Sequence, residues 1–147
     1  MIREVIRTVG GIWKQRLPAL EFTAQWSVSE EYIRGIINEL GSGRENTRII
    51  VEYLNQKRER DCAAQLCQSL DIGGYNDWFL PNFKELNLMY DNLWLNGLGD
   101  FHSRWYWSSS SDSSKGGHNT WCKSFSNGNL FLIDRNQIHS VRAIRVF

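Results

Sequence analysis

Residues 105–147 read WYWSSSSDSSKGGHNTWCKSFSNGNLFLIDRNQIHSVRAIRVF, and this stretch decides the fold. Short aromatic and apolar runs alternate here with clusters of Gly, Ser and Asn, which is typical of strands joined by turns. Asn127-Gly128 indicates a hairpin, because a type I′ turn needs positive φ at both of its central positions. We expect strands at residues 105–109, 120–126, 130–134 and 140–146.

The same stretch contains two kinds of residue. Trp107, Trp121 and Phe125 have the size and apolar character of a framework, whereas residues 111–118 and 130–139 follow no folding pattern. A fixed framework that carries irregular segments is typical of a binding surface displayed on a scaffold. It is not typical of a catalytic centre.

One expected strand breaks the alternation of apolar and polar residues. The apolar run Leu130–Ile133 indicates either a strand buried on both faces or an exposed apolar patch. In the second case Phe131 and Ile133 face a ligand, since large apolar side chains form the centres of protein interfaces. Of Trp105 and Tyr106, one faces the core and the other faces outward, because successive side chains of a strand alternate.

Helical patterns dominate the residues before position 100. Apolar residues recur at helical spacing between residues 27 and 40, and Asn82 with Glu85 forms a capping box. The expected helices are residues 27–40, a stripe of Ile50, Val51 and Leu54 after a loop at 41–47, a helix capped by Asp61, and a helix capped by Asn82 that ends at Gly97. Residues 12–22, which surround Pro18, indicate one or two edge strands.

Helices followed by strands predict an α+β fold. A length of 147 residues fits one domain with a core of its own. We expect the core to contain Trp78, Leu86, Met89, Leu93, Trp107, Trp121 and Phe125.

The net charge of +1 is unevenly spread along the chain. Residues 101–147 carry six Lys or Arg against two Asp or Glu. This mild excess favours an anionic partner but is too small to indicate nucleic acid. No apolar run approaches the length of a membrane-spanning helix, and the first residues contain Arg3, Glu4 and Arg7 where a secretion signal needs an apolar core. We therefore expect a cytoplasmic protein unless another export route exists.

The inventory of reactive side chains predicts no enzyme. The three cysteines Cys62, Cys67 and Cys122 lack the spacing of zinc or redox sites, and we expect free buried thiols. Cys122 with His118 is the only pair that resembles an activated nucleophile. Asp77 is expected to be a turn former, and the oxygen ligands of a calcium site are lacking. We expect no metal and no cofactor.

Six motifs occur in order and carry a family resemblance: GSGRENTRIIV, CAAQLCQSL, GGYNDWFLPNFKELNLMY, YWSSS, W-x-x-x-F-x-x-G and VRAIRVF. Together they resemble the Lcl C-terminal domain family over about residues 41–147. The resemblance implies a C-type-lectin-like fold in which helices support a twisted antiparallel sheet with long loops. Residues 27–40 depart from it and are expected to be a helical insertion. Members of the family include bacterial surface adhesins that bind sulfated glycans.

The sequence is most similar to the members that are variable proteins of diversity-generating retroelements. In these systems reverse transcription miscopies template adenines and rewrites the end of a gene. Residue types that adenine changes in an asparagine codon can produce stand at Asp112, Ser113, Ser114, His118, Asn119, Ser124, Phe131, Ile133, Asp134, Asn136, Ile138 and His139. Lys115, Lys123 and Gln137 cannot arise in this way, so they are interpreted as framework.

The resemblance therefore implies a changeable surface that binds a protein. We expect its contacts to come from Arg104, Tyr106, Asp112, Ser113, Ser114, His118, Asn119, Cys122, Ser124, Leu130, Phe131, Ile133, Asp134, Asn136, Ile138 and His139. A second hypothesis is a glycan-binding module that holds sulfate with Arg104, Lys115, Lys123 and Arg135. A third is a cytosolic structural module.

Overall fold

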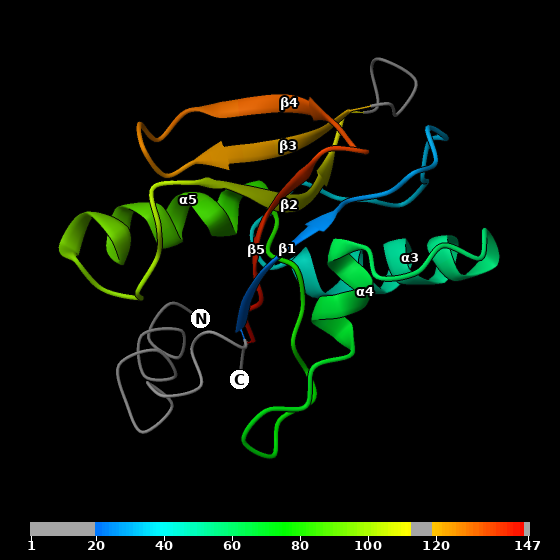
Figure 1. The fold of residues 1–147 in the computed structure, drawn as a ribbon, viewed down its shortest axis with the longest axis horizontal. Helices are drawn as coiled ribbons and strands as arrows, with labels where there is room; N and C mark the ends of the chain where they lie inside the picture. The colour runs from blue at the N-terminus through cyan, green and yellow to red at the C-terminus, as the bar shows by residue number, and fades with distance from the viewer. Residues whose placement is uncertain (1–19, 113–118, 146–147) are drawn as a thin grey trace.

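The computed structural model describes residues 20–112 and 119–145, which form a sheet with strand order β1-β5-β2-β3-β4 (Figure 1). Its strands are β1 (Glu21–Gln25), β2 (Trp105–Ser111), β3 (Asn119–Ser124), β4 (Leu130–Asp134) and β5 (Ile138–Arg142). The helices are α3 (Gly43–Gln56), α4 (Ala63–Gln68), α5 (Phe83–Asn92) and the short 3-10 helix η2 (Trp94–Asn96). The α+β class is confirmed.

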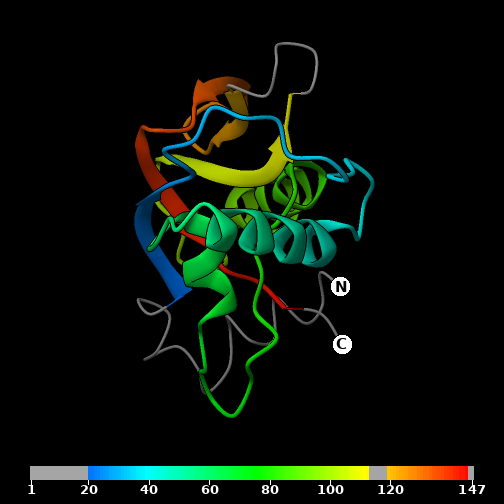
Figure 2. The same ribbon diagram turned by 90° about the vertical axis from the view of Figure 1, so that its right-hand side faces the viewer.

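Helix α3 packs against β2, α5 packs against β2 and β3, and β4 lies at the outer edge of the molecule (Figure 1, Figure 2). The sheet is mixed, so the expectation of an antiparallel sheet was wrong in one place. Strand β5 enters between β1 and β2 and pairs with β2 in parallel, with Tyr106 opposite Ser140. The other three strand pairs are antiparallel.

The consecutive serines of β2 form a bulge between Trp107 and Ser111. Ser108 donates its hydroxyl to the carbonyl of Trp121 at 2.7 Å. The hydroxyl of Ser110 accepts the backbone N–H of Phe83 at 3.1 Å, at the first residue of α5. Extra residues in one strand leave polar groups unpaired. At this bulge the two serine hydroxyls form hydrogen bonds that connect β2 to β3 and α5.

Helix α5 begins as expected, with a capping box between Asn82 and Glu85. Glu85 also accepts the backbone N–H of Gly43 at 2.9 Å. A Cβ at position 43 would lie 2.4 Å from that carboxylate oxygen. Glycine is therefore needed there for close packing of α3 against α5, and the expected loop at 41–47 was wrong because α3 starts at Gly43.

The expected helix at residues 27–40 is also wrong, because this segment is irregular. Its polar backbone groups are held by side chains from elsewhere in the fold. Glu59 accepts hydrogen bonds from the Ser27 hydroxyl and the Val28 N–H, and Asn46 bonds both backbone groups of Ile37. These long-range hydrogen bonds replace those of a helix.

Two helix boundaries differ from expectation. The N-cap of α4 is Cys62 rather than Asp61, and Gln65 completes its capping box. Helix α5 ends at Asn92, and Gly97 instead closes η2 in a left-handed conformation with φ of 68°.

The hairpin between β3 and β4 is confirmed, but its turn is not type I′. Gly128 has φ of 79°, whereas Asn127 is not among the described residues with positive φ. Asn127 instead accepts the N–H of Asn129 with its side chain, and Ser124 donates its N–H to the carbonyl of Asn129. The longer connection brings Gly128 against the ring of Tyr90 in α5.

The expected core is confirmed except at Trp121. Trp78, Leu86, Met89, Leu93, Trp107 and Phe125 are buried in one cluster. Trp121 is half-buried and contacts Phe83 of α5, with ring centroids 6.2 Å apart. Its side chain lies outside the main cluster because β3 is near the sheet edge. The strand Leu130–Asp134 is half-buried along its whole length, between the two alternatives considered for it.

The last arginines of the chain are structural. Arg145 binds both carboxylate oxygens of Asp77, at 2.7 and 3.0 Å, and stacks on Tyr75. This ion pair lowers the pKa of Asp77, and it is an interaction that the interpretation of Asp77 as a turn former did not include. Arg142 is buried and pairs with Glu21 of β1 at 2.8 Å.

Candidate ligand-binding surface

Three rings from different strands form an aromatic stack on the sheet. The Trp105 ring stacks on Phe131, with centroids 4.9 Å apart and planes 13° apart, and on His139, at 5.5 Å and 29°. His139 lies on β5 and Phe131 on β4, which flank β2 on opposite sides in the strand order. The two rings therefore cover opposite faces of the Trp105 indole.

Strand register places these side chains on one face. Trp107 is opposite Cys122, and Cys122 is opposite Phe131. Trp105 shares the face of Trp107, because side chains two apart point the same way. Trp107 is fully buried, donates its indole N–H to the carbonyl of Ala24 at 2.9 Å, and meets His139 edge-on. The stack thus covers the core of the domain.

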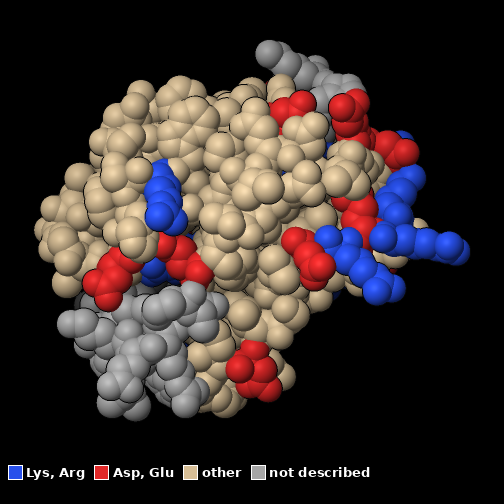
Figure 3. All heavy atoms as spheres, viewed as in Figure 1, with Lys and Arg blue, Asp and Glu red and all other residues tan. Residues whose placement is uncertain are grey.

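The surface around the stack is apolar and partly exposed. Trp105 is 36% exposed and Ile138 is 65% exposed. Figure 3 shows few charged atoms over β3 and β4, whereas Lys, Arg, Asp and Glu gather on the other side of the view. An exposed apolar patch on a soluble domain marks an interaction surface. We call Trp105, Phe131 and His139 the aromatic surface; Ile138 precedes His139 on β5, so its side chain points to the other face of that strand.

Trp105 also offers a hydrogen-bond donor. The indole N–H groups of Trp26, Trp78 and Trp107 donate to backbone carbonyls at 2.8, 3.0 and 2.9 Å. Trp105 makes no such bond with the described residues. A half-exposed indole with an unused N–H is the kind of group that dominates protein interfaces.

The surroundings of His139 favour its neutral form. One ring nitrogen, Nε2, lies 2.8 Å from the side-chain oxygen of Gln137. Burial between two tryptophans lowers the pKa of His139 below its ordinary value, because desolvation disfavours the charged ring. The lowered pKa favours the uncharged ring, which stacks on Trp105.

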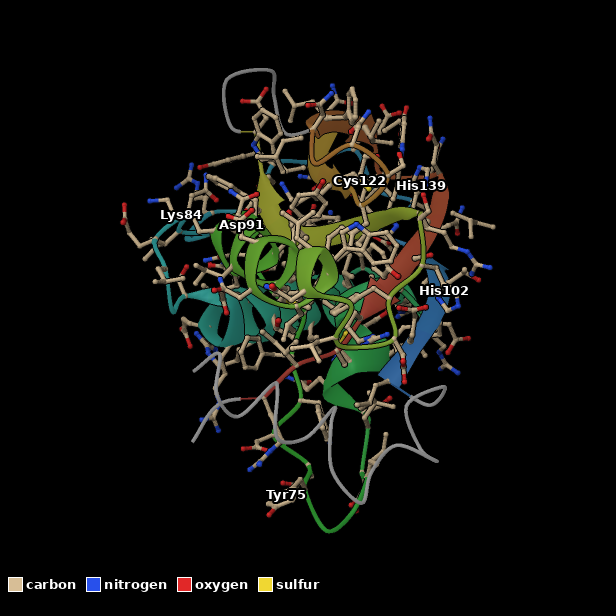
Figure 4. The ribbon with its side chains drawn as sticks, turned by 90° about the vertical axis from the view of Figure 1, so that its left-hand side faces the viewer. Tyr75, Lys84, Asp91, His102, Cys122 and His139 are labelled. Atoms are coloured by element: carbon tan, nitrogen blue, oxygen red, sulfur yellow. The ribbon has the colours of Figure 1, made fainter. Side chains whose placement is uncertain are left out.

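Most of the expected contact residues that the structure describes are exposed or half-buried. They are Arg104, Asp112, Asn119, Leu130, Phe131, Ile133, Asp134, Asn136, Ile138 and His139. Ser113, Ser114, His118 and Lys115 lie outside the described residues. Figure 4 shows Cys122 and His139 at the upper part of the sheet, far from Tyr75 at the other end of the molecule.

Three residues that were expected to contact a ligand have buried side chains, so the expectation was wrong for them. Tyr106 is fully buried, and its hydroxyl bonds Glu21 and the N–H of His102. Cys122 is fully buried, between Trp107 and Phe131 in the strand register. Ser124 is buried with its hydroxyl 2.7 Å from that of Ser126. Each faces the interior, so none can contact a ligand in this conformation.

The stack itself was not predicted. Trp105, Phe131 and His139 come from three strands whose order is not readable from the sequence, since β5 inserts between β1 and β2. The available signal was the pair Trp105 and Trp107, two aromatic residues on one strand face. It indicates a large apolar area on that face but not which rings complete it.

The three cysteine thiols are buried. Burial raises the pKa of the Cys122 thiol above its ordinary value, which suppresses the nucleophilic thiolate. The pKa of Cys62 is likewise raised by burial, to about 12. No group of three or more His, Cys, Asp or Glu in residues 20–112 and 119–145 is arranged to hold a metal ion. In the same residues, no helix is long and apolar enough to cross a membrane.

Two hollows lie away from the aromatic surface. One, of about 470 Å³, is lined by residues that include Arg44, Asp77 and Trp78. The other, of about 740 Å³, lies between the end of α3 and α4 and is lined by polar residues that include Arg58, Asp61 and Gln65. Neither contains a residue of the aromatic surface.

The chain matches a protein-family model. The model of the Lcl C-terminal domain matches residues 9–145, which is nearly the whole length. The comparison with curated proteins finds no match.

Proposed function

This chain belongs to the Lcl C-terminal domain family, and from that premise we propose that it is a non-catalytic domain that binds another protein through the aromatic surface. The observation that carries the proposal is the stack of Trp105 between Phe131 and His139, half-exposed on a rigid sheet. Rigid aromatic anchors surrounded by small polar residues are typical of protein-binding surfaces.

We further propose that the fold is C-type-lectin-like and that the protein is the variable product of a diversity-generating retroelement. The side chains best placed to change are Asp134, Asn136 and Ile138, because they are exposed or half-buried on the β4–β5 connection. The buried Ser124 does not fit, since a new side chain there would meet the core. A near-identical repeat beside a reverse transcriptase gene, differing at adenines, is the genomic prediction.

Two of the four cationic side chains that the glycan hypothesis assigns to sulfate binding are buried. Arg135 is 1% exposed and stacks on Trp26, and Lys123 is 5% exposed with its ammonium 2.7 Å from the carbonyl of Gly128. Arg104 alone of the described cations in that set is exposed. Both faces of the Trp105 ring are covered, so the indole offers no face on which a sugar ring can stack. These observations favour a protein ligand.

A selection experiment tests the proposed function. A phage-displayed library randomises Phe131, Ile133, Asp134, Asn136 and Ile138 and is selected for binding to purified serum albumin. The control library randomises exposed positions of α3, namely Arg44, Glu45, Arg48 and Glu52. We expect binders from the first library only, because large apolar contact area is available only at the aromatic surface.

The selected binders then receive Trp105→Ala. We expect at least a tenfold loss of affinity, since the exposed indole is the anchor shared by all members. Equal enrichment from the α3 library, or binding that does not depend on Trp105, would contradict the proposed function.

A further inference from the structure

Strand β4 is an open edge of the sheet. It is the last strand in the order β1-β5-β2-β3-β4 and pairs with β3 only. Figures 1 and 2 both show it at the outer limit of the molecule. An open edge presents backbone donors and acceptors that another strand can match.

The hydrogen bonds of β3 show which groups of β4 point outward. Phe125 donates its N–H to Arg104, toward β2, and Ser124 donates its N–H to Asn129, toward β4. Successive backbone groups alternate in direction, so Cys122 and its partner Phe131 bond each other. Leu132 consequently directs its N–H and C=O away from the sheet.

The same alternation directs the backbone groups of Leu130 and Asp134 outward. Within the described part of the chain, the only backbone bond to this row runs from the N–H of Gln137 to the carbonyl of Asp134. The strand LFLID contains no proline, lysine or bulge, which are the devices that protect an edge from pairing. Its residues are half-buried on both faces.

We infer that β4 pairs with β4 of a second copy of this chain, antiparallel across a two-fold axis at Leu132. In this register Leu132 is opposite its own counterpart, and Leu130 is opposite Asp134 of the other copy. These residues carry the outward backbone groups, so both strands meet as hydrogen-bonded pairs. The two sheets join into one continuous sheet.

The strand is complementary to itself in side chains and charge. Phe131 of one copy lies opposite Ile133 of the other on the face of the aromatic surface, which is a favourable aromatic and β-branched pair. The only charged residue of the strand is Asp134, at its end. The two-fold axis places the two Asp134 side chains at opposite ends of the interface, where they do not repel each other.

The pairing would enlarge the aromatic surface, because each copy adds Phe131 and Ile133 to the face presented by the other. It does not depend on the proposed function. A dimer that binds no ligand would contradict the proposed function alone. A monomer that binds a ligand would contradict this inference alone.

Cysteine cross-linking tests the register. All three native cysteines are buried, so a thiol introduced by Leu132→Cys is the accessible one. Directly opposed hydrogen-bonded residues are about 5.5 Å apart between Cα atoms, which suits a disulfide. Ile133→Cys is the matched control, since its two copies would lie about 8 Å apart from a rise of about 3.3 Å per residue.

We expect a covalent dimer from Leu132→Cys under mild oxidation and at least tenfold less from Ile133→Cys. Sedimentation of the unmodified chain should show a dimer that Leu132→Lys dissociates, because two ammonium groups would meet at the axis. Circular dichroism verifies that the lysine variant remains folded. A chain that stays monomeric at high concentration, or equal cross-linking at both positions, overturns the inference, including the case in which β4 pairs with a ligand protein instead.

Discussion

Glu85 couples the packing of α5 to pH. Its Oε1 accepts the N–H groups of Gly43 and Asn82, while Oε2 is buried with no partner among the described residues. Burial raises the pKa of this carboxyl to about 7, from 4.5. The folded state therefore holds a proton that the unfolded state has released between these two pH values.

This proton makes stability fall as pH rises from about 4.5 to 7, because the folded state binds more protons in that window. The free energy of unfolding should drop by up to about 3 kcal/mol at 1.36 kcal/mol per pKa unit. Glu85→Gln keeps the acceptor for Gly43 and removes the charge. We expect a flatter profile and higher stability at pH 8, measured by urea unfolding.

Glu45→Gln is the control for that measurement, because Arg48 lowers the pKa of Glu45, so its change should not flatten the profile between about pH 4.5 and 7. Parallel profiles for the native chain and Glu85→Gln would show that Glu85 is not the group that titrates.

Among the helices and strands, the sequence pattern predicted correctly those features that depend on interactions between neighbouring residues. The capping box of Asn82 and Glu85 and the strand 130–134 were predicted correctly because both depend on neighbours in sequence. Residues 27–40 were misread because Glu59 and Asn46 bind their backbone from distant positions. The start of α3 was misread because Gly43 serves close packing rather than a turn.

For the candidate site, too, local features were predicted and features that depend on the order of the strands were not. The alternation of strand side chains predicts that Trp105 and Tyr106 face opposite sides, and Trp105 is indeed exposed while Tyr106 is buried. The burial of Cys122 and Ser124 depends on what covers β3. That cover comes from β4 and from the position of β5, which no local pattern encodes.

Two tryptophans of the β2–β3 ribbon should differ in their cost of substitution. Trp107 is fully buried with its N–H bonded, so Trp107→Ala should cost about 3–5 kcal/mol. Trp121 is half-buried at the edge, so Trp121→Ala should cost clearly less than Trp107→Ala. Urea unfolding of both variants measures the difference, and equal losses would contradict the core described above.

For the whole molecule, we expect folding without a metal ion. The described residues contain no cluster of three or more potential ligands, and the buried charges Arg142 and Arg145 have protein partners. A chelator should therefore leave the melting temperature unchanged, because a ligand that binds only the folded state is not present to be removed. A fall in melting temperature that calcium reverses would disprove this.

The central claim is that the aromatic surface can change while the scaffold persists. Asp134, Asn136 and Ile138 lie at the surface, where substitutions usually alter stability by less than about 0.5 kcal/mol. Phe131 and His139 are half-buried against Trp105, and His139 also contacts Trp107, so substitutions at these two positions are expected to destabilise the scaffold most.

The most direct measurement is the folded fraction of a library randomised at Asp112, Asn119, Phe131, Ile133, Asp134, Asn136, Ile138 and His139, scored by resistance to proteolysis. A library of the same size that randomises buried core positions such as Leu86, Met89 and Trp107 is the control. We predict that most members of the first library resist the protease and most members of the second do not. If most members of the first library are digested, these residues belong to the core, and the proposal of a changeable binding surface is wrong.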